Sequence, residues 1–95
     1  MPNFVFEWDE HKANLNLRKH KVSFEEATTV FDDPYLMTFP DEEHSDNEQR
    51  FIDIGNSAKA RTLVVIHTER EEIIRIISGR KATMTERGVY ETGNF

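Results

Sequence analysis

Residues 62–78 read TLVVIHTEREEIIRIIS and carry the clearest strand pattern of the chain. Two runs rich in β-branched residues, 62–68 and 73–78, are separated by the four residues 69–72. Apolar runs of this length with a short polar interruption are typical of two strands joined by a tight connection. The segment therefore predicts an antiparallel β-hairpin at the centre of the fold.

Upstream of the hairpin, three segments have the pattern of strands. Residues 4–8 place Phe, Phe and Trp on one side and Val and Glu on the other, and residues 50–54 alternate in the same way. Residues 35–39 form a shorter candidate strand that ends at Pro40, and residues 55–57 form a turn before the hairpin.

Three helices are predicted from their N-terminal signals. Asp9 is a candidate N-cap for a helix that runs to about residue 20. Ser23 with Glu26, and Thr83 with Glu86, have the spacing of capping boxes, in which the two residues satisfy each other's backbone groups. The second helix is expected to stop at residues 32–34 and the third near residues 90–91.

The order β-α-α-β-β-β-β-α predicts an α+β fold with two N-terminal helices packed on a mostly antiparallel sheet. Burying a large apolar side chain contributes roughly 1.5–3 kcal/mol, so the core should take the large apolar residues of these elements. The expected core residues are Phe4, Phe6, Trp8, Leu17, Phe24, Phe31, Val64, Ile66, Ile74 and Ile76.

Length and composition limit the class of protein. A chain of 95 residues is expected to form a single domain over residues 1–95. Cysteine is absent, which excludes disulfides, thiolate metal sites and a cysteine nucleophile. The longest apolar run, 63–66, is far shorter than the roughly 18 residues of a membrane span. We expect a cytoplasmic protein without a membrane segment.

The net charge of −6 is unevenly distributed. Residues 1–58 hold 5 Lys/Arg against 13 Asp/Glu, whereas residues 59–95 hold 7 against 5. One interpretation is that the basic C-terminal part forms a surface that binds phosphates. Uneven charge is also common in small domains, so the distribution alone leaves both interpretations open.

The hairpin and the residues after it hold the densest set of chemically competent side chains. Metal-free RNA cleavage needs a base for the ribose 2′-hydroxyl, an acid for the leaving oxygen and fixed positive charge for the phosphate. The predicted catalytic residues are His67, Arg70, Glu71 and Arg80. The predicted RNA-binding residues are Arg75 and Lys81.

Among these residues, His67 and Glu71 are expected to transfer protons, and Arg70 and Arg80 to stabilise the phosphate. Strict alternation along the strand places Arg75 on the face of Ile73 and Ile77, and places Arg80 on the opposite face. A structural interpretation competes for each group: Arg75 in a salt bridge, and His67 as a hydrogen-bonded residue at a strand end.

Two other groups of residues are candidates for binding a metal, a phosphate or a partner. The acidic loop over residues 41–48 carries carboxylates and His44 that are potential metal ligands, although no glycine lies where an EF-hand turn needs one, and a solvated loop is the simpler interpretation. Lys12, Asn16 and Lys19 share a predicted helix face that is suited to phosphate or a partner, or that is simply solvated. We expect no cofactor and no metal.

The chain also resembles the BrnT family of bacterial toxins over nearly its whole length. The matching segments are Phe6-Glu7-Trp8-Asp9, Lys12, Asn16-Leu17-Arg18-Lys19-His20, Val22-Ser23-Phe24-Glu25-Glu26-Ala27, Phe31-x-Asp33-Pro34, Glu48-x-Arg50-Phe51-Ile52-x-Ile54-Gly55, His67-Thr68-Glu69-Arg70, Arg75-Ile76-Ile77-Ser78-x-Arg80-Lys81-Ala82 and Glu86-Arg87 with Tyr90-Glu91. One departure is Lys21, because the family usually has glycine after the Lys-His pair.

The resemblance implies a RelE-like fold and a ribonuclease toxin of a type II toxin–antitoxin system that inhibits translation. It implies an RNA substrate and a BrnA-like antitoxin with a ribbon-helix-helix DNA-binding domain, so that DNA is bound only through a toxin–antitoxin hetero-oligomer. Two alternatives stay open: a catalytically inactive module that serves as antitoxin partner and operon co-repressor, and an interaction domain unrelated to RNA.

Overall fold

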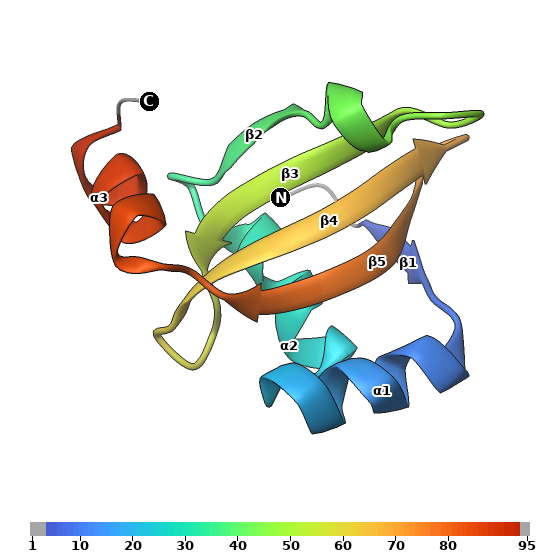
Figure 1. Ribbon diagram of the computed structural model, residues 1–95, viewed down its shortest axis with the longest axis horizontal. Coiled ribbons are helices and arrows are strands. Elements are labelled where there is room, and N and C mark those ends of the chain that lie inside the picture. Colours follow the sequence, from blue (N-terminus) through green and yellow to red (C-terminus); the bar gives the residue numbers. More distant parts are fainter. Residues whose placement is uncertain (1–3, 94–95) are drawn as a thin grey trace.

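The structure is a computed structural model that describes residues 4–93. Its centre is a five-stranded sheet in the order β1-β5-β4-β3-β2 (Figure 1). The parallel pair is β1 with β5, and the other neighbours are antiparallel. The strands are β1 Val5–Glu7, β2 Met37–Pro40, β3 Arg50–Asn56, β4 Thr62–Arg70 and β5 Ile73–Lys81. The predicted α+β class with a mostly antiparallel sheet is confirmed.

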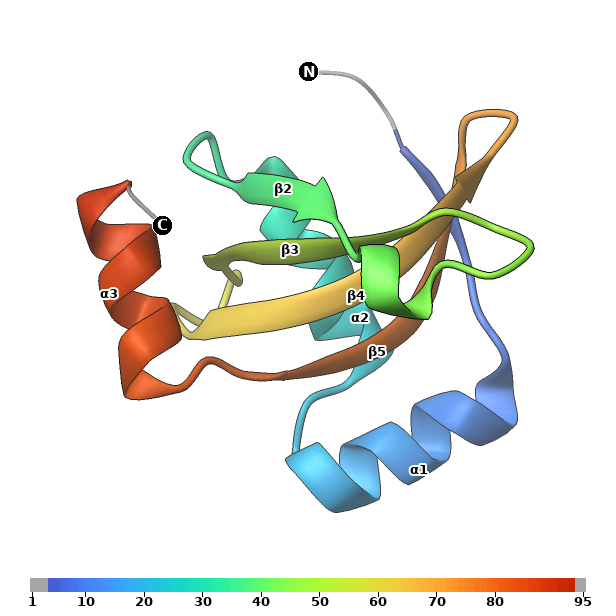
Figure 2. The ribbon, with the colours of Figure 1, turned by 45° about the horizontal axis from the view of Figure 1, so that its top comes forward.

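The helices lie in two places. The first two, α1 Glu10–His20 and α2 Phe24–Thr28, contact β5, and the short helical turn η1 Thr29–Asp32 contacts β3. The last helix, α3 Met84–Thr92, stands beyond one end of the sheet, apart from α1 and α2, and a turn η2 Glu42–His44 lies between β2 and β3 (Figures 1 and 2). One face of the sheet is therefore covered, and we call the other the open face. None of the helices in residues 4–93 is long and apolar enough to cross a membrane.

The core lies between the sheet and the first two helices. Its buried members are Ala13, Val22, Phe24, Ala27, Val30, Leu63, Val65, Ile74 and Ile76, with Phe6, Trp8, Phe31 and Leu36 packed against them. The predictions for Phe24, Ile74 and Ile76 are confirmed. Leu17 and Phe4 are 48% and 40% exposed, so their prediction as core residues is wrong. Val64 is buried outside this cluster, and Ile66 is half-buried.

Helix α1 buries Asn16 where Leu17 was expected. The Asn16 side chain donates to the carbonyl oxygens of Val22 and Gly79, at 2.9 and 2.8 Å, and accepts from the Gly79 N–H at 3.2 Å. Three hydrogen bonds satisfy a buried amide and fix the helix against β5. The expected exposed face with Lys12, Asn16 and Lys19 is therefore wrong, because Asn16 belongs to the interior.

The caps of the helices differ from one another. Lys21 takes the left-handed conformation, with a φ of 59°, so the turn after α1 is made without glycine, at a cost of about 1 kcal/mol. The capping box of α3 is complete. In α2 the Ser23 hydroxyl caps Glu26 as expected, but the Glu26 side chain turns away to Arg61 and Ser57. The Asp9 side chain makes no cap hydrogen bond.

Candidate functional site

A row of polar residues crosses four strands on the open face. The register pairs Arg50 with Thr68, Thr68 with Arg75, and Arg75 with Glu7. Directly paired residues of neighbouring strands point to the same side of a sheet, so the four side chains share one face. Arg75 Nη1 donates to Glu7 Oε2 at 2.7 Å. We call these four residues the open row.

The hairpin that ends beside this row is tighter than expected. Pairing continues to Arg70 and Ile73, which leaves a loop of two residues rather than four. The loop residues Glu71 and Glu72 have φ values of 51° and 69°. Two-residue hairpin turns of this kind favour asparagine and glycine, because other residues are strained at positive φ. Two glutamates are thus held in an unfavourable conformation at the rim of the open face.

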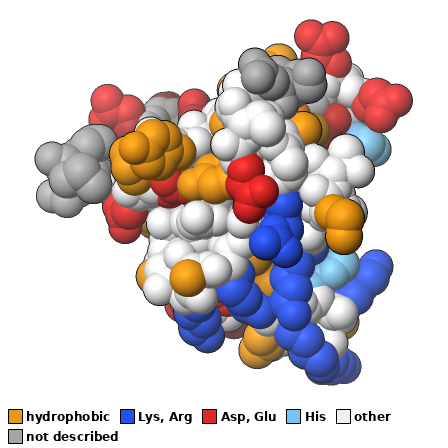
Figure 3. Space-filling view, turned by 90° about the vertical axis from the view of Figure 1, so that its left-hand side faces the viewer, with side chains coloured by type: hydrophobic (Ala, Val, Ile, Leu, Met, Phe, Trp, Pro, Cys, Tyr) orange, Lys and Arg blue, Asp and Glu red, His pale blue; other side chains and the backbone are white. Residues whose placement is uncertain are grey.

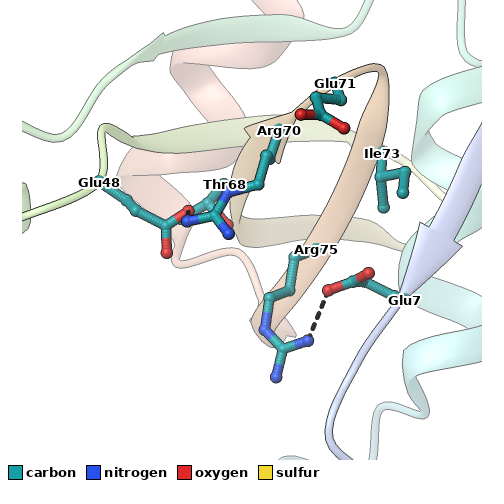
Figure 4. A pocket seen from close by; sticks show the side chains of 7 residues that line it. All are labelled: Glu7, Glu48, Thr68, Arg70, Glu71, Ile73 and Arg75. Carbon is teal, nitrogen blue, oxygen red and sulfur yellow. Dashed lines mark hydrogen bonds and ion pairs between the residues drawn. The ribbon is translucent and has the colours of Figure 1, made fainter.

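The open row borders two hollows. The first, the hairpin hollow, has a volume of about 300 Å³ and is lined by Glu7, Glu48, Thr68, Arg70, Glu71, Ile73 and Arg75 (Figure 4). The second, the loop hollow, has a volume of about 310 Å³ and is lined by Lys12, His44, Asp46, Asn47, Glu48, Arg50, Thr68, Arg75 and Ile77. Glu48, Thr68 and Arg75 line both, so the two hollows are neighbours on either side of Arg75.

The cations of these hollows are only weakly engaged. Arg70 lies 3.5 Å from Glu48, and the two side chains are 75% and 45% exposed. The Arg75–Glu7 pair is also solvent-exposed, and exposed ion pairs contribute only about 0–1 kcal/mol. Within the described part of the chain, neither Lys12 nor Arg50 forms an ion pair. These cations are therefore available to bind a phosphate, because their carboxylate partners are weak or absent among the described residues.

His67 lies on the other side of the sheet. It is 1% exposed and faces the helices, with its ring stacked on Phe51 and edge-on to Phe31, each at a centroid distance of 5.2 Å. Its Nδ1 bonds the carboxylate of Asp53, and its Nε2 lies 3.1 Å from Glu69 Oε1. Burial acts to lower the pKa of His67, but the hydrogen bonds and charges of Asp53 and, to a smaller extent, Glu69 together outweigh it, so the pKa is raised. His67 does not line either hollow.

Arg80 and Lys81 lie at the opposite end of β5 from the hairpin. Arg80 donates through both terminal nitrogens to Glu86 of α3, at 2.7 and 2.8 Å. The Arg80 hydrogen bonds hold the pKa of Glu86 at about 2, despite partial burial. Lys81 lines a separate depression with Arg61 and Arg87. Five residues along a strand span about 16 Å, so Arg80 is remote from Arg75.

The six predicted site residues therefore occupy three places. Arg70, Glu71 and Arg75 line the hairpin hollow. His67 lies in the interior, and Arg80 and Lys81 lie at the end of β5 opposite the hairpin. The expected faces of β5 also need correction. A β-bulge opposite Ile66 and His67 inserts Ile77, so Gly79 faces the core and Arg80 shares the open face with Arg75.

Several residues of the hollows were missed or assigned differently from the sequence. Arg50 and Glu7 were read as ordinary strand residues, and Lys12 was placed on a helix face. Arg50 could be assigned to the site only from its pairing with Thr68, and that pairing requires knowledge of the register of β3 on β4. His44 and Glu48 were assigned to the acidic loop. There, Asp41 accepts from His44 Nδ1 at 3.1 Å, and residues 4–93 contain no group of three or more side chains placed to hold a metal ion.

Comparison with known proteins gives two matches and one negative result. A family model described as ribonuclease toxin, BrnT, of type II toxin–antitoxin system matches residues 8–86. The 1.1 Å crystal structure of the Brucella abortus ribonuclease toxin BrnT is similar, with a TM-score of 0.67 and 22% sequence identity, over 86% of this chain and 100% of that one. A search of curated proteins found no match. The structural likeness supports the fold, and the family model covers most of the chain. The chain belongs to the BrnT family of ribonuclease toxins of type II toxin–antitoxin systems.

Proposed function

We propose that this chain is a metal-independent endoribonuclease that cleaves RNA and thereby inhibits translation, and that it acts at the hairpin hollow. The observation that carries the proposal is the open row, in which Arg50 and Arg75 lie on either side of Thr68, with Arg75 and Arg70 both lining the hairpin hollow. Fixed guanidinium groups suit the charge that develops on a phosphate in the transition state.

The chemistry assigned to the hollow is transfer of the phosphate to the neighbouring ribose hydroxyl. The 2′-oxygen forms a bond to phosphorus as the bond to the 5′-oxygen breaks, which leaves a 2′,3′-cyclic phosphate and a 5′-hydroxyl. We assign the base that takes the 2′-proton to Glu71. We assign the donor to the leaving oxygen to His44, across Arg75 in the loop hollow. Arg70 and Arg75 stabilise the non-bridging oxygens.

This assignment keeps the roles of Arg70 and Glu71 predicted from the sequence, changes Arg75 from RNA binding to stabilisation of the phosphate, and moves the other roles. His67 would have to break its bond to Asp53 and leave the interior to reach RNA. Arg80 would have to release Glu86. We therefore assign both to support of the structure.

The partners follow from family membership. A type II toxin has an antitoxin, and we propose that the antitoxin here is a BrnA-like protein with a ribbon-helix-helix domain. Toxin and antitoxin form a hetero-oligomer in the cytoplasm, and the antitoxin's domain binds DNA. We further propose that the fold is RelE-like and that residues 1–95 act as one toxin domain. The order of strands and the helix-covered face are compatible with this.

The test is cleavage of single-stranded RNA by the purified chain in EDTA. Wild type is expected to cleave, and Glu71→Gln to lose activity. Glu72→Gln is the matched control, because Glu72 is in the same turn with the same backbone conformation but does not line the hollow.

Each negative result has a defined meaning. Loss of all cleavage in EDTA that returns with a divalent cation contradicts metal independence. Equal activity of both variants contradicts the role of Glu71. A wild type that binds antitoxin but never cleaves RNA supports the alternative of an inactive partner and co-repressor.

A further inference from the structure

A second concentration of positive charge lies at the end of the molecule opposite the hairpin. We call it the basic end, and it comprises Arg18, Lys21, Lys59, Arg61, Lys81 and Arg87. These are six of the 12 Lys/Arg residues of a chain whose net charge is −6. Figure 3 shows Lys and Arg side chains gathered over the lower part of this end, with the acidic side chains mostly elsewhere.

Contacts in the structure connect these residues. Arg61, Lys81 and Arg87 line one shallow depression of about 300 Å³, together with Ala60, Thr62 and Ala82. Arg61 donates to the carbonyl oxygen of Lys21 at 3.1 Å, and Lys21 Nζ donates to that of Arg18 at 3.1 Å. The segments 18–21, 59–61 and 81–87 therefore meet at this end although they are far apart in the sequence.

Most of this charge is uncompensated. In the salt bridges of residues 4–93, Arg61 is the one member of the basic end with a carboxylate partner, the buried Glu26. Glu26 also accepts from Ser57, and the Ala58 N–H donates to Thr29, so the turn that carries Lys59 is fixed to α2 and η1. Arg61 and the backbone that carries Lys59 are thus fixed in place before any ligand arrives.

The composition of the depression indicates the class of ligand. Protein interfaces are anchored by aromatic and large apolar side chains, whereas alanine, threonine, lysine and arginine line this depression. Cations without apolar anchors are typical of contacts to a phosphate backbone, which position a nucleic acid without reading its sequence.

We propose that the basic end binds the phosphate backbone of the RNA substrate, several nucleotides away from the bond that is cleaved. The proposal rests on the proposed function, since it takes the ligand to be the same RNA. The nine residues of β5 span about 30 Å, so one strand of RNA that follows β5 reaches from the hairpin hollow to the basic end.

The test measures binding without cleavage. A 2′-O-methyl RNA strand long enough to follow β5 lacks the 2′-hydroxyl nucleophile, so its affinity for the full chain can be measured by fluorescence anisotropy over a series of salt concentrations. Each lost phosphate contact should reduce the slope of log affinity against log salt by about 0.7 for a single strand. Lys81→Ala is expected to reduce it by about 0.7 and Lys81→Ala/Arg87→Ala by about 1.4.

The matched control is Tyr35→Glu, which lowers the net charge by the same unit as Lys81→Ala at a residue that is 77% exposed and outside the basic end. Its slope is expected to stay at the wild-type value. An unchanged slope in the double variant overturns the proposal, as does a slope that falls equally in the control. Tighter binding of an acidic peptide than of RNA, lost in the double variant, overturns it in favour of a protein ligand.

The cleavage assay separates this proposal from the proposed function. At saturating RNA the double variant is expected to cleave at the wild-type rate, because its residues lie outside both hollows. If wild type cleaves no RNA while the salt slopes change as stated, the proposed function fails and the basic end remains an RNA-binding site.

Discussion

Two adjacent rows of residues that cross β3, β4 and β5 point to opposite faces of the sheet. Phe51, His67 and Ile76 face the helices, and the next row along, Arg50, Thr68 and Arg75, faces the open side. In the first row the charged group is enclosed and fully bonded, with His67 between two aromatic rings and held by Asp53. In the second row the charges are exposed and weakly paired. One step along a strand therefore separates charge that stabilises the fold from charge that is available to a ligand.

The strongest test of this comparison is removal of the buried imidazole. His67→Ala leaves Asp53 buried with Thr38 as its remaining side-chain partner and opens a cavity between Phe31 and Phe51. Breaking a buried pair in this way costs about 3–5 kcal/mol, a large part of the stability of a small domain. We expect a loss of that size in urea unfolding, and a loss below 1 kcal/mol would show that the pair is unimportant to the fold.

The same pair predicts how stability depends on pH. Asp53 and Glu69 raise the pKa of His67 above the ordinary value of 6.5. The contribution of charged His67 is therefore complete below about pH 6.5 and is lost as the pH rises through the raised pKa. Urea unfolding of wild type should show this decline above pH 6.5, and His67→Ala should lack it. A wild-type contribution that increases over this range contradicts the direction of the shift.

The hairpin turn is expected to show a smaller change of opposite sign. Replacing Glu71 and Glu72 with Asn and Gly suits their positive φ values and should raise the free energy of unfolding by about 1 kcal/mol. The Glu71→Asn/Glu72→Gly variant should at the same time lose RNA cleavage, because the Glu71 carboxylate is gone. Glu72→Gly alone should gain stability and keep its activity. If the double variant stays active, the strained turn serves no purpose in catalysis.

The smallest effect is expected at the junction of β5 with α3. Arg80→Ala removes a two-point contact to Glu86 that is partly exposed, so the expected loss of stability is about 1 kcal/mol or less. Cleavage should remain near the wild-type rate in a single-turnover assay. A folded Arg80→Ala protein without activity would return Arg80 to the catalytic role expected from the sequence.

The order of the elements could be predicted because each has a local signal. The β-branched runs of residues 62–68 and 73–78 predict the hairpin, and the Thr83–Glu86 spacing predicts the cap of α3. The inward position of Asn16 could not be predicted, because its partners are backbone groups of Val22 and Gly79, the latter 63 positions away. Helical spacing alone favours Leu17, which is exposed.

The site was less predictable, for two physical reasons. A single bulge in β5, opposite Ile66 and His67 of β4, changes which side of the sheet the later residues of β5 face. No residue type in the sequence indicates the position of this bulge. The residues that lie beside Arg75 in the open row come from β1, β4 and β3, so the site depends on a strand register that local sequence patterns do not define. Residues near His67 in sequence were therefore grouped together although the sheet separates them.

Whether cleavage takes place at the hollows of the open face or at the buried His67 can be decided by comparing the cleavage rates of Arg75→Ala and His67→Ala. Both are measured on single-stranded RNA in EDTA, at a temperature where circular dichroism shows both folded. We expect Arg75→Ala to be slower than wild type by about 10²–10³-fold, equal to about 2.7–4 kcal/mol, as for loss of a transition-state donor. His67→Ala should stay within about a factor of ten of wild type. A folded His67→Ala protein that is inactive beside an active Arg75→Ala protein would contradict cleavage at the hollows of the open face.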